Sequence, residues 1–305
     1  MKRYIIRRLL WGIVVMWLVS VIIFLSTRVG SDPVYMMAEP GASKEDLDVL
    51  RRRFALDKPL PVQYLIFFSR AVRGDFGESL LYTAPVSGIL LERLPPTLEL
   101  IFAAQIISLL IGVTGGVLAA TRSGKWIGRS ARIFSLLGLS MPNFWIALLC
   151  VLFFSLTLRI FPTSGRGGID HLVLPAFSLG WYFSAGYTRI THSALLQVLN
   201  QEYIKLARIK GLPEKLVVGK HALKNALIPI VTLAGMNLVV MISAGVAIET
   251  VFAWPGLGFL MYQAALVRDF NAVQGVVLII SFMMVMVNLL VDILYAYIDP
   301  RIRYT

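Results

Sequence analysis

Two Gly-Lys pairs are the places in this sequence where a phosphate-binding loop could end. A P-loop needs another glycine five positions earlier, so that backbone N–H groups can cradle a phosphate. Ala119 occupies that position for Gly124-Lys125, and Glu214 occupies it for Gly219-Lys220. The sequence therefore does not predict that this chain binds and hydrolyses ATP through a P-loop.

The other side chains with catalytic potential are scattered along the chain. The three histidines, His171, His192 and His221, form neither a His-x3-His pair nor an HExxH motif, which are spacings typical of zinc enzymes. The one cysteine, Cys150, lies in an apolar stretch with no His/Asp array at a suggestive spacing, and this context favours packing over nucleophilic chemistry. The sequence thus indicates a protein that is not an enzyme by itself.

Two acidic residues, Glu249 and Asp292, lie near the ends of apolar stretches. An ionisable group inside a membrane is by default a candidate for a transport pathway or gate. Near the end of a span, however, it can also be solvated or paired with a basic neighbour. Ion-coupled carriers usually use more buried ionisable groups, or broken helices in paired repeats. Glu249 is the stronger candidate of the two.

The composition indicates a membrane protein. Hydrophobic residues make up 57% of the 305 residues and charged residues 15%, and the mean hydropathy is +0.76. A soluble domain has roughly 25% charged residues. A helix that crosses a bilayer needs about 20 mostly apolar residues. Six stretches meet this description and predict six transmembrane helices, at 9–27, 98–120, 133–160, 172–187, 227–252 and 272–298.

The distribution of basic residues predicts the orientation. Short cytoplasmic loops of membrane proteins are enriched in Lys and Arg. Residues 1–8 hold four basic residues, residues 121–132 hold four and residues 188–226 hold seven. The long segment 28–97 is nearly neutral. We therefore expect a multi-pass protein of the plasma (inner) membrane with both termini in the cytoplasm, and its net charge of +12 reflects these loops.

Three regions follow from this topology. Residues 1–27 form the cytoplasmic N-terminus and the first span, residues 28–97 an external segment, and residues 98–305 a five-helix core that includes the cytoplasmic loop 188–226. The external segment is expected to fold. Ser43 can cap a helix with apolar positions at Leu47, Leu50 and Phe54, and a second helix is expected from Pro61 to a stop near Gly74.

The cytoplasmic loop contains an unusual stretch, EYIKLARIKGLPEKLVVGKHALKNALIPI, at residues 202–230. It predicts a first short helix that ends at Gly211, because glycine readily adopts a left-handed backbone. Leu212-Pro213 then starts a second short helix, with Pro in its first turn and Glu214 near its positive end. The result is two short helices at an angle to each other.

The first of these helices is expected to present one apolar face. Tyr203, Leu206 and Ala207 are predicted to share it, with Lys205, Arg208 and Lys210 around the other faces. The small residues Ala207 and Gly211 would permit close approach of another surface. A basic loop that only sets topology, or an amphipathic segment lying on anionic lipid, would explain the charges. The Gly-Leu-Pro break favours a docking site instead, because a helix that lies on lipid gains nothing from ending in the middle of a loop. Apolar faces rimmed by charge also mark interaction sites.

This stretch resembles the EAA loop of ABC importer permeases, in the version of the dipeptide/oligopeptide/nickel permease family. The general loop has Glu-Ala where this chain has Lys205-Leu206, and Pro where it has Lys224; the peptide-type version is similar to this chain at those points. The resemblance covers nearly the whole chain. The motifs that carry it are Arg3-Tyr4-Ile5-Ile6-Arg7-Arg8-Leu9, Asp32-Pro33-Val34, Leu56-Asp57-Lys58-Pro59-Leu60, Gly74-Asp75-Phe76-Gly77, Arg93-Leu94-Pro95-Pro96-Thr97-Leu98-Glu99, Ser140-Met141-Pro142-Asn143-Phe144, Ala207-x3-Gly211, residues 221–229, residues 249–258 and Asp299-Pro300-Arg301-Ile302-Arg303-Tyr304.

The resemblance implies a type I (MetI-like) ABC importer permease fold, in which a cytoplasmic coupling helix sits in a groove of a separate ATPase subunit. It also implies that the turn after the fifth span, with Glu249 before it, serves as an outer gate or receptor contact. The residues implied in ATPase coupling are Glu202, Tyr203, Lys205, Ala207, Arg208, Lys210, Gly211 and Leu212, and those implied in the gate or receptor contact are Glu249, Trp254, Pro255 and Gly256.

The resemblance further implies an ATP-driven importer, with di- or oligopeptides as its expected cargo. The implied partners are a second homologous permease, two ABC ATPase subunits, an external solute-binding protein and membrane lipid. Nucleic acid is not among them. No cofactor or metal is expected in this chain, because ATP and Mg²⁺ would bind the partner ATPases. An ion- or proton-coupled carrier and a non-transporting membrane scaffold are the alternatives, and neither needs the docking stretch.

Overall fold

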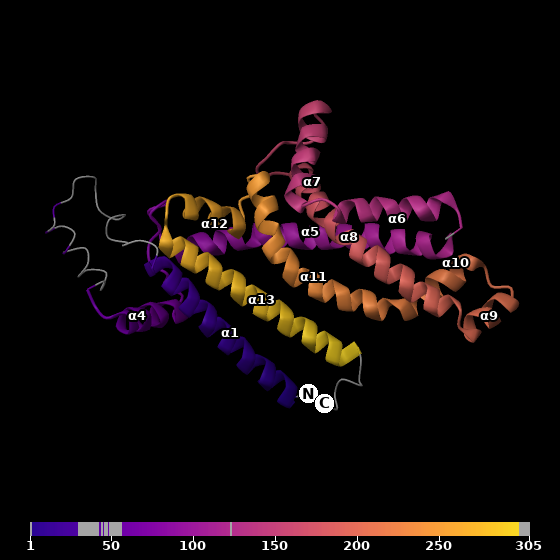
Figure 1. Cartoon of the computed structure of the whole chain (residues 1–305), viewed down its shortest axis with the longest axis horizontal. Helices are drawn as coiled ribbons and strands as arrows, with labels where there is room; N and C mark the ends of the chain where they lie inside the picture. The colour runs from indigo at the N-terminus through magenta and orange to yellow at the C-terminus, as the bar shows by residue number, and fades with distance from the viewer. Residues whose placement is uncertain are drawn as a thin grey trace. The chain divides into compact units, whose positions relative to one another are not determined.

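The computed structural model describes residues 2–29, 57–122 and 124–298, together with the single residues 43, 45 and 48. Within these residues the regular secondary structure is helical, apart from one isolated β-bridge between Glu78 and Pro85, which confirms the expected all-α class (Figure 1). The helices (η marks a π-helix) are, in chain order, α1 (Lys2–Val29), α4 (Leu60–Val72), α5 (Val86–Thr121), α6 (Trp126–Leu139), α7 (Asn143–Cys150), η1 (Val151–Thr157), α8 (Ile169–Leu199), α9 (Glu202–Ile209), α10 (Glu214–Leu216), η2 (Val217–Ala222), α11 (Leu223–Val251), α12 (Leu257–Leu266) and α13 (Phe270–Ile298).

The chain divides into two compact units, Met1–Pro96 with Gly256–Met286 and Thr97–Pro255 with Val287–Thr305. In the first unit, α1 runs antiparallel to the first part of α13. Gln274 Nε2 donates to Thr27 Oγ1 at 2.5 Å, and a Cβ atom at Gly12 would lie 2.8 Å from Val285 Cγ1. The glycine therefore allows the two apolar helices to approach closely.

The second external helix predicted from the sequence is α4. It begins one residue before Pro61, and the chain leaves it through Gly74, whose φ is +77°. Tyr64 packs on Phe24 of α1 with ring centroids 5.5 Å apart. The helix expected to start at Ser43 lies almost wholly outside the described residues.

A buried carboxylate fixes the segment between α4 and α5 to the turn between α12 and α13. Asp269 is completely buried. Its Oδ2 accepts from Ser79 Oγ at 2.5 Å and from the Leu81 backbone N–H at 3.2 Å, and its Oδ1 accepts from the Ala272 N–H at 3.1 Å. Asn271 Nδ2 also donates to the Glu78 carbonyl at 2.9 Å. These bonds satisfy a charge whose burial without partners would be costly.

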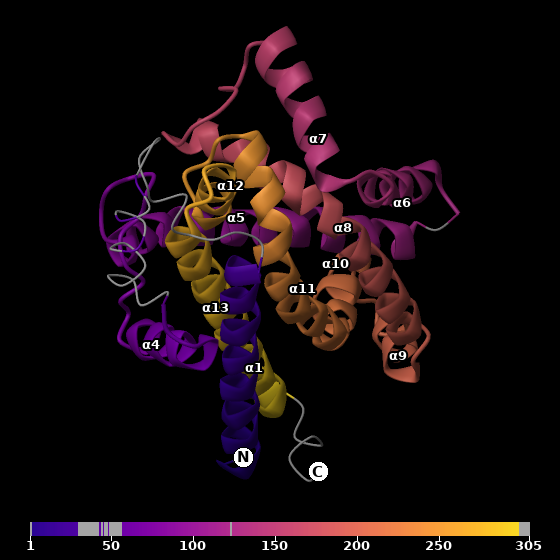
Figure 2. The ribbon, with the colours of Figure 1, turned by 60° about the vertical axis from the view of Figure 1, so that its left-hand side comes forward.

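The second unit is organised around α8. This helix packs against α6, α7 and α11, and α9 and η2 also contact it (Figure 2). Glycines on α5 allow its backbone to approach α8, since a Cβ atom at Gly116 would lie 2.5 Å from Thr191 Cβ. Thr188 Oγ1 of α8 donates to Ser135 Oγ of α6 at 2.7 Å. Small and hydroxylated residues thus replace large apolar ones where these helices cross.

The third predicted span, 133–160, is not one continuous helix. α6 ends at Leu139, and α7 followed by η1 leaves it at an angle of 106°. Pro142 stands at the N-cap of α7 and has no N–H to continue the ladder from α6. The residue before a proline, Met141, is also disfavoured in the α region. The prediction of one uninterrupted helix over residues 133–160 was wrong because Pro142 interrupts it.

Length and composition support four spans among the described helices, in α1, α5, residues 214–251 and α13, or five if the bent pair α6 and α7–η1 counts as one. The fourth predicted span, 172–187, does lie within a helix, the 31-residue α8. Charged residues, among them Asp170 in its first turn and Arg189 further along, interrupt the apolar run of α8, which is not among these four helices. The structure therefore establishes several apolar spans and leaves the count of six as a prediction.

Candidate functional site

The docking stretch folds into two short helices joined by a sharp turn, and we call residues 202–222 the elbow. The first helix, α9, ends where Gly211 adopts a φ of +76°, as the sequence predicts. The Gly211 N–H donates to the Arg208 carbonyl at 3.0 Å and the Leu212 N–H to the Ala207 carbonyl at 3.3 Å. These bonds satisfy carbonyls that the end of the helix would otherwise leave free.

The second short helix begins immediately after Pro213, which is the N-cap of α10 rather than part of its first turn. α10 continues as the π-helix η2 and then as α11, which is long and apolar. π-helical turns are uncommon and often lie at functional sites. The elbow is therefore continuous with a predicted span.

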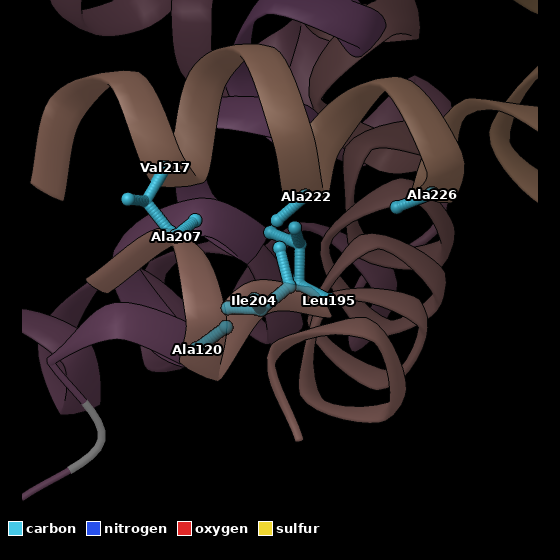
Figure 3. Packing of buried hydrophobic residues seen from close by; sticks show 7 residues of the cluster. All are labelled: Ala120, Leu195, Ile204, Ala207, Val217, Ala222 and Ala226. Atoms are coloured by element: carbon cyan, nitrogen blue, oxygen red, sulfur yellow. The ribbon is translucent and has the colours of Figure 1, made fainter. Parts of the chain in front are cut away.

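A cluster of buried apolar side chains anchors the elbow to the helices around it (Figure 3). Ile204 of α9 and Val217 of η2 are completely buried, and Leu195 of α8 lies between them and α11. Fully burying side chains of this size contributes about 1.5–3 kcal/mol each. The members of the cluster, drawn from five helices, are Ala120, Leu195, Ile204, Ala207, Val217, Ala222 and Ala226.

Ala207 belongs to this anchor and not to the exposed face. It is 8% exposed, whereas Tyr203 and Leu206, expected beside it, are 44% and 56% exposed. The prediction that Ala207 shares the exposed apolar face with Tyr203 and Leu206 was therefore wrong. Ile209, which sequence reasoning did not select, is 80% exposed. Its signal was present in the sequence, because residues 203, 206 and 209 recur at a spacing of three on one side of a helix.

The exposed side of α9 consists of an apolar ridge, defined as Tyr203, Leu206 and Ile209, flanked by ion pairs. Lys205 Nζ lies 2.7 Å from Glu202 Oε1 within α9. Arg208 reaches across the turn and donates from Nη2 to Glu214 Oε1 at 2.7 Å and from Nε to Oε2 at 3.2 Å. This second pair connects the two arms of the elbow.

The pair between the two arms changes the acidity of both groups. The hydrogen bond from Arg208 holds the pKa of Glu214 below its ordinary value, and the hydrogen bond from Glu214 raises the pKa of Arg208. Both side chains are more than one third exposed, so solvent screens the interaction. The pair links the two arms of the elbow and contributes little to the stability of the fold.

A hydrogen bond joins the ridge to the start of α11. Asn225 Nδ2 donates to the Tyr203 hydroxyl at 2.8 Å and to the His221 carbonyl at 2.9 Å. Sequence reasoning did not select Asn225, because nothing in its local pattern shows that it reaches a residue 22 positions earlier. Lys210 and Leu212, the remaining predicted coupling residues, flank Gly211 at the corner of the elbow.

The predicted outer turn lies at the other end of α11. Glu249 is 1% exposed, and its Oε1 accepts a hydrogen bond from Thr97 Oγ1 at 2.7 Å. Its backbone carbonyl accepts from the Trp254 N–H at 2.8 Å, and Ala253 adopts a φ of +46° to close the turn. The structure thus brings Glu249 and Trp254 together in a buried turn. Pro255 follows in the same unit, whereas Gly256 belongs to the other one.

Arg166 covers this turn from the segment between η1 and α8. Its guanidinium lies 6.0 Å from the centroid of the Trp254 ring and donates to Glu99 Oε2 at 2.8 Å. The Gly165 N–H also donates to the Phe252 carbonyl at 2.8 Å. Within the described ranges, no group of three or more His, Cys, Asp and Glu residues could hold a metal ion. The arrangement is that of a fixed structural turn.

Solved structures identify the class of fold. The chain aligns with a membrane chain of the MetNI methionine ABC transporter in an inward-facing conformation at a TM-score of 0.57 and 20% identity, over 69% of this chain and 96% of that one. A chain of an amino acid ABC transporter solved with histidines aligns at 0.56 and 17% identity, over 69% and 94%. The helical fold is therefore shared with these chains of ABC transporters.

Sequence comparison identifies the family. Residues 112–304 match the family model described as binding-protein-dependent transport system inner membrane component, and residues 1–101 match its N-terminal companion. The chain belongs to this family. It is 39% identical to the oligopeptide transport system permease protein AppB of Bacillus subtilis and 36% identical to the glutathione transport system permease protein GsiC of Escherichia coli K12, in each case over 100% of both chains. A putative peptide permease protein of Brucella suis is 38% identical over the same full lengths.

Membership of this family makes the chain a multi-pass inner-membrane permease of an ABC importer, a class of pore subunits that are not catalytic by themselves. The resemblance found in the sequence is confirmed. An ion-coupled carrier is not favoured by any of these matches.

Proposed function

We propose that this chain forms the translocation path of a peptide importer together with a second, homologous permease. Two ABC ATPases bind it from the cytoplasm, and an external solute-binding protein delivers the cargo. ATP and Mg²⁺ bind the ATPases, and this chain itself holds no cofactor. The energy for import comes from the different affinities of the ATPases for nucleotide in the two states of the path.

The proposed topology has six crossings with both termini in the cytoplasm. The bent pair α6 and α7–η1 counts as one crossing, and α8 counts as another. Residues 28–97 lie outside, and residues 98–305 form the core. α8 supports this proposal because it is 31 residues long, roughly 46 Å at 1.5 Å per residue, which is more than a bilayer core requires.

The observation that carries the proposal is the elbow. The apolar ridge is exposed on a helix whose opposite face is firmly buried, so the ridge is positioned for contact and cannot simply fold inward. Lipid could also cover an apolar ridge. The ion pair between Arg208 and Glu214 supports a protein groove instead, because it joins the two arms of a bent segment and a helix lying on lipid does not need such a bend.

The outer turn is proposed to act as a gate element. The burial of Glu249 and Trp254 supports a role in shaping the turn, and Pro255 and Gly256 extend it toward the expected position of the receptor. We infer that Glu249 positions this turn through Thr97 and the Trp254 backbone, while contact with the receptor is made by the neighbouring exposed residues.

Peptides are the proposed cargo because the relatives named above are oligopeptide, peptide and glutathione permeases. Nickel complexes and some sugars are alternatives. Mass spectrometry of the ligand that co-purifies with the cognate binding protein identifies the class. Peptides or glutathione support the proposal, whereas a sugar or a metal complex contradicts the cargo while leaving the importer class intact.

Docking is tested by Leu206→Glu in the purified complex. A charge placed at the centre of the ridge should weaken the binding of the ATPase subunits at least tenfold, about 1.4 kcal/mol, as expected at the centre of an interface. Leu65→Glu is the matched control, because Leu65 of α4 is 64% exposed and lies outside the elbow. Normal ATPase binding by the Leu206 variant would refute the docking site.

A further inference from the structure

A pocket in the second unit lies where α6 breaks from α7. It is lined by the beginning of α7, the middle of α8 and the outer half of α11. It adjoins the break at which α7 leaves α6 at 106°, and Pro142 at this break is one of its lining residues. On α11, the small residues Ala244 and Ala247 leave room at its wall.

Hydrogen bonds hold the entrance of the pocket in place. Asn143 Nδ2 donates to the Ala244 carbonyl at 3.0 Å, which ties the first residue of α7 to α11. Asn143 Oδ1 accepts from the Phe144 N–H at 2.8 Å. Both ends of this amide are therefore engaged, and each still has capacity for one more hydrogen bond. The wall at this point is polar and ordered.

Two residues that carry hydroxyl groups, Tyr182 of α8 and Ser243 of α11, also line this pocket. In the described part of the chain, neither hydroxyl has a hydrogen-bond partner. A hydroxyl that met hydrocarbon without a partner would be unfavourable. The two hydroxyl groups therefore suit a lining that meets water or a polar ligand better than one that meets lipid.

The lining also restricts the kind of ligand. It contains no Asp, Glu, Lys or Arg, so it offers no charge to pair with a charged group. Two aromatic residues, Phe144 and Phe183, line the same pocket as Asn143, Tyr182 and Ser243. Such a surface matches the neutral amide groups of a peptide and an apolar side chain, and it does so without selecting one sequence.

We propose that this pocket, on the proposed import path, is a transient contact site for the peptide backbone of the cargo. Tyr182, Ser243 and Asn143 bind its amide groups, and the two phenylalanines accept its side chains. This inference rests on the proposed function, because a peptide must cross the membrane beside α8 and α11 for the pocket to meet it.

The test uses the one native cysteine. Cys150 is buried, and Cys150→Ser gives a background in which Ser243→Cys introduces a single thiol of similar size at the pocket. In the assembled transporter in proteoliposomes, a water-soluble maleimide should label that thiol about tenfold faster than the thiol of an Ile106→Cys control, because the reactive thiolate forms only in contact with water. Ile106 is an exposed apolar residue of α5 outside the pocket.

Contact with the cargo is measured as protection of the thiol at position 243 from the maleimide. A mixture of cysteine-free dipeptides, loaded on the binding protein with ATP present, should slow labelling at position 243 severalfold and leave the control unchanged. Tyr182→Phe should raise the KM for uptake severalfold with little change in the rate of ATP hydrolysis. The inference is overturned if the thiol at position 243 is labelled as slowly as the control thiol. It is also overturned if that thiol is labelled fast and the dipeptides do not slow its labelling. Dipeptide uptake by the Cys150→Ser transporter, measured separately, tests the proposed function.

Discussion

The hydrogen bond between Tyr203 and Asn225 should transmit force from the elbow to α11. It is the direct side-chain link, at 2.8 Å, between the exposed ridge and the first turns of the long helix. Tyr203→Phe removes only the hydroxyl, and Asn225→Ala removes the amide. Both variants keep the anchor of buried residues beneath the elbow. We expect the complexes to assemble normally and to transport less cargo for each ATP hydrolysed.

The size of the effect follows from the type of bond. A neutral hydrogen bond contributes about 0.5–1.5 kcal/mol net, which corresponds to a factor of about two to twelve. The ratio of transport to ATP hydrolysis should fall by that factor in each single variant. Because both changes remove the same bond, the double variant should be no worse than Asn225→Ala alone. Asn225→Ala also loses the bond to the His221 carbonyl and should be the more affected single variant.

The assay measures ATP hydrolysis and uptake together in the same proteoliposomes. Tyr262→Phe on α12 is the control, because Tyr262 has a similar exposed fraction, 46%, and lies in the other unit. An unchanged ratio in Tyr203→Phe would refute the reasoning. Purely additive losses in the double variant would also refute it, since independent residues add and coupled ones do not.

Changes at three other positions test the elbow. Gly211→Val should uncouple ATP hydrolysis from transport, whereas Gly211→Asn should retain more transport per ATP. The reason is the backbone, because Asn tolerates a φ of +76° and a β-branched residue does not. Steric space does not distinguish the two variants, since no described atom lies within 4 Å of the added Cβ. Ile204→Ala should lower stability by about 2–5 kcal/mol, seen as a lower Tm of the complex. Glu214→Gln should weaken ATPase binding near neutral pH. Because the pKa of Glu214 is lowered, the free energy contributed by its pair with Arg208 is present above the ordinary carboxyl pKa and is lost as the pH falls through the lowered value. The ATPase affinities of the wild-type and variant complexes should therefore become equal in acid. A variant difference that persisted below that range would contradict the assignment.

Local signals in the sequence predicted the elements well. Gly211 ended its helix with the expected left-handed backbone, and α4 began one residue before the proline and ended two residues before the glycine that marked it. Such features depend on steric rules within a few residues, which the sequence contains in full. The all-helical membrane class followed from composition for the same reason.

Tertiary partners could not be predicted in this way. Ala207 was expected on the exposed face, but a helix of eight residues has too few turns for periodicity to separate its inner side from its outer side. Asn225 and Thr97 were missed because their partners, Tyr203 and Glu249, are 22 and 152 positions away. The break at Pro142 was visible as a proline, yet its angle depends on packing against α8 and α11.

The helix α11 follows the elbow directly and lines the pocket, and this connects the two proposals. α11 carries Asn225 in its first turn and Ser243 18 residues later, a separation of roughly 27 Å at 1.5 Å per residue. A helix transmits a displacement along its axis without loss, whereas a proline within it permits bending. Pro229 lies between the two residues, close to the elbow. Movement of a docked ATPase would therefore reach the pocket as a shift of the outer part of α11, hinged near Pro229, and the hydroxyl of Ser243 would move relative to Asn143 and Tyr182. Binding of cargo and movement of the elbow are then coupled through the position of one helix, because any ligand that holds these groups together opposes the same shift.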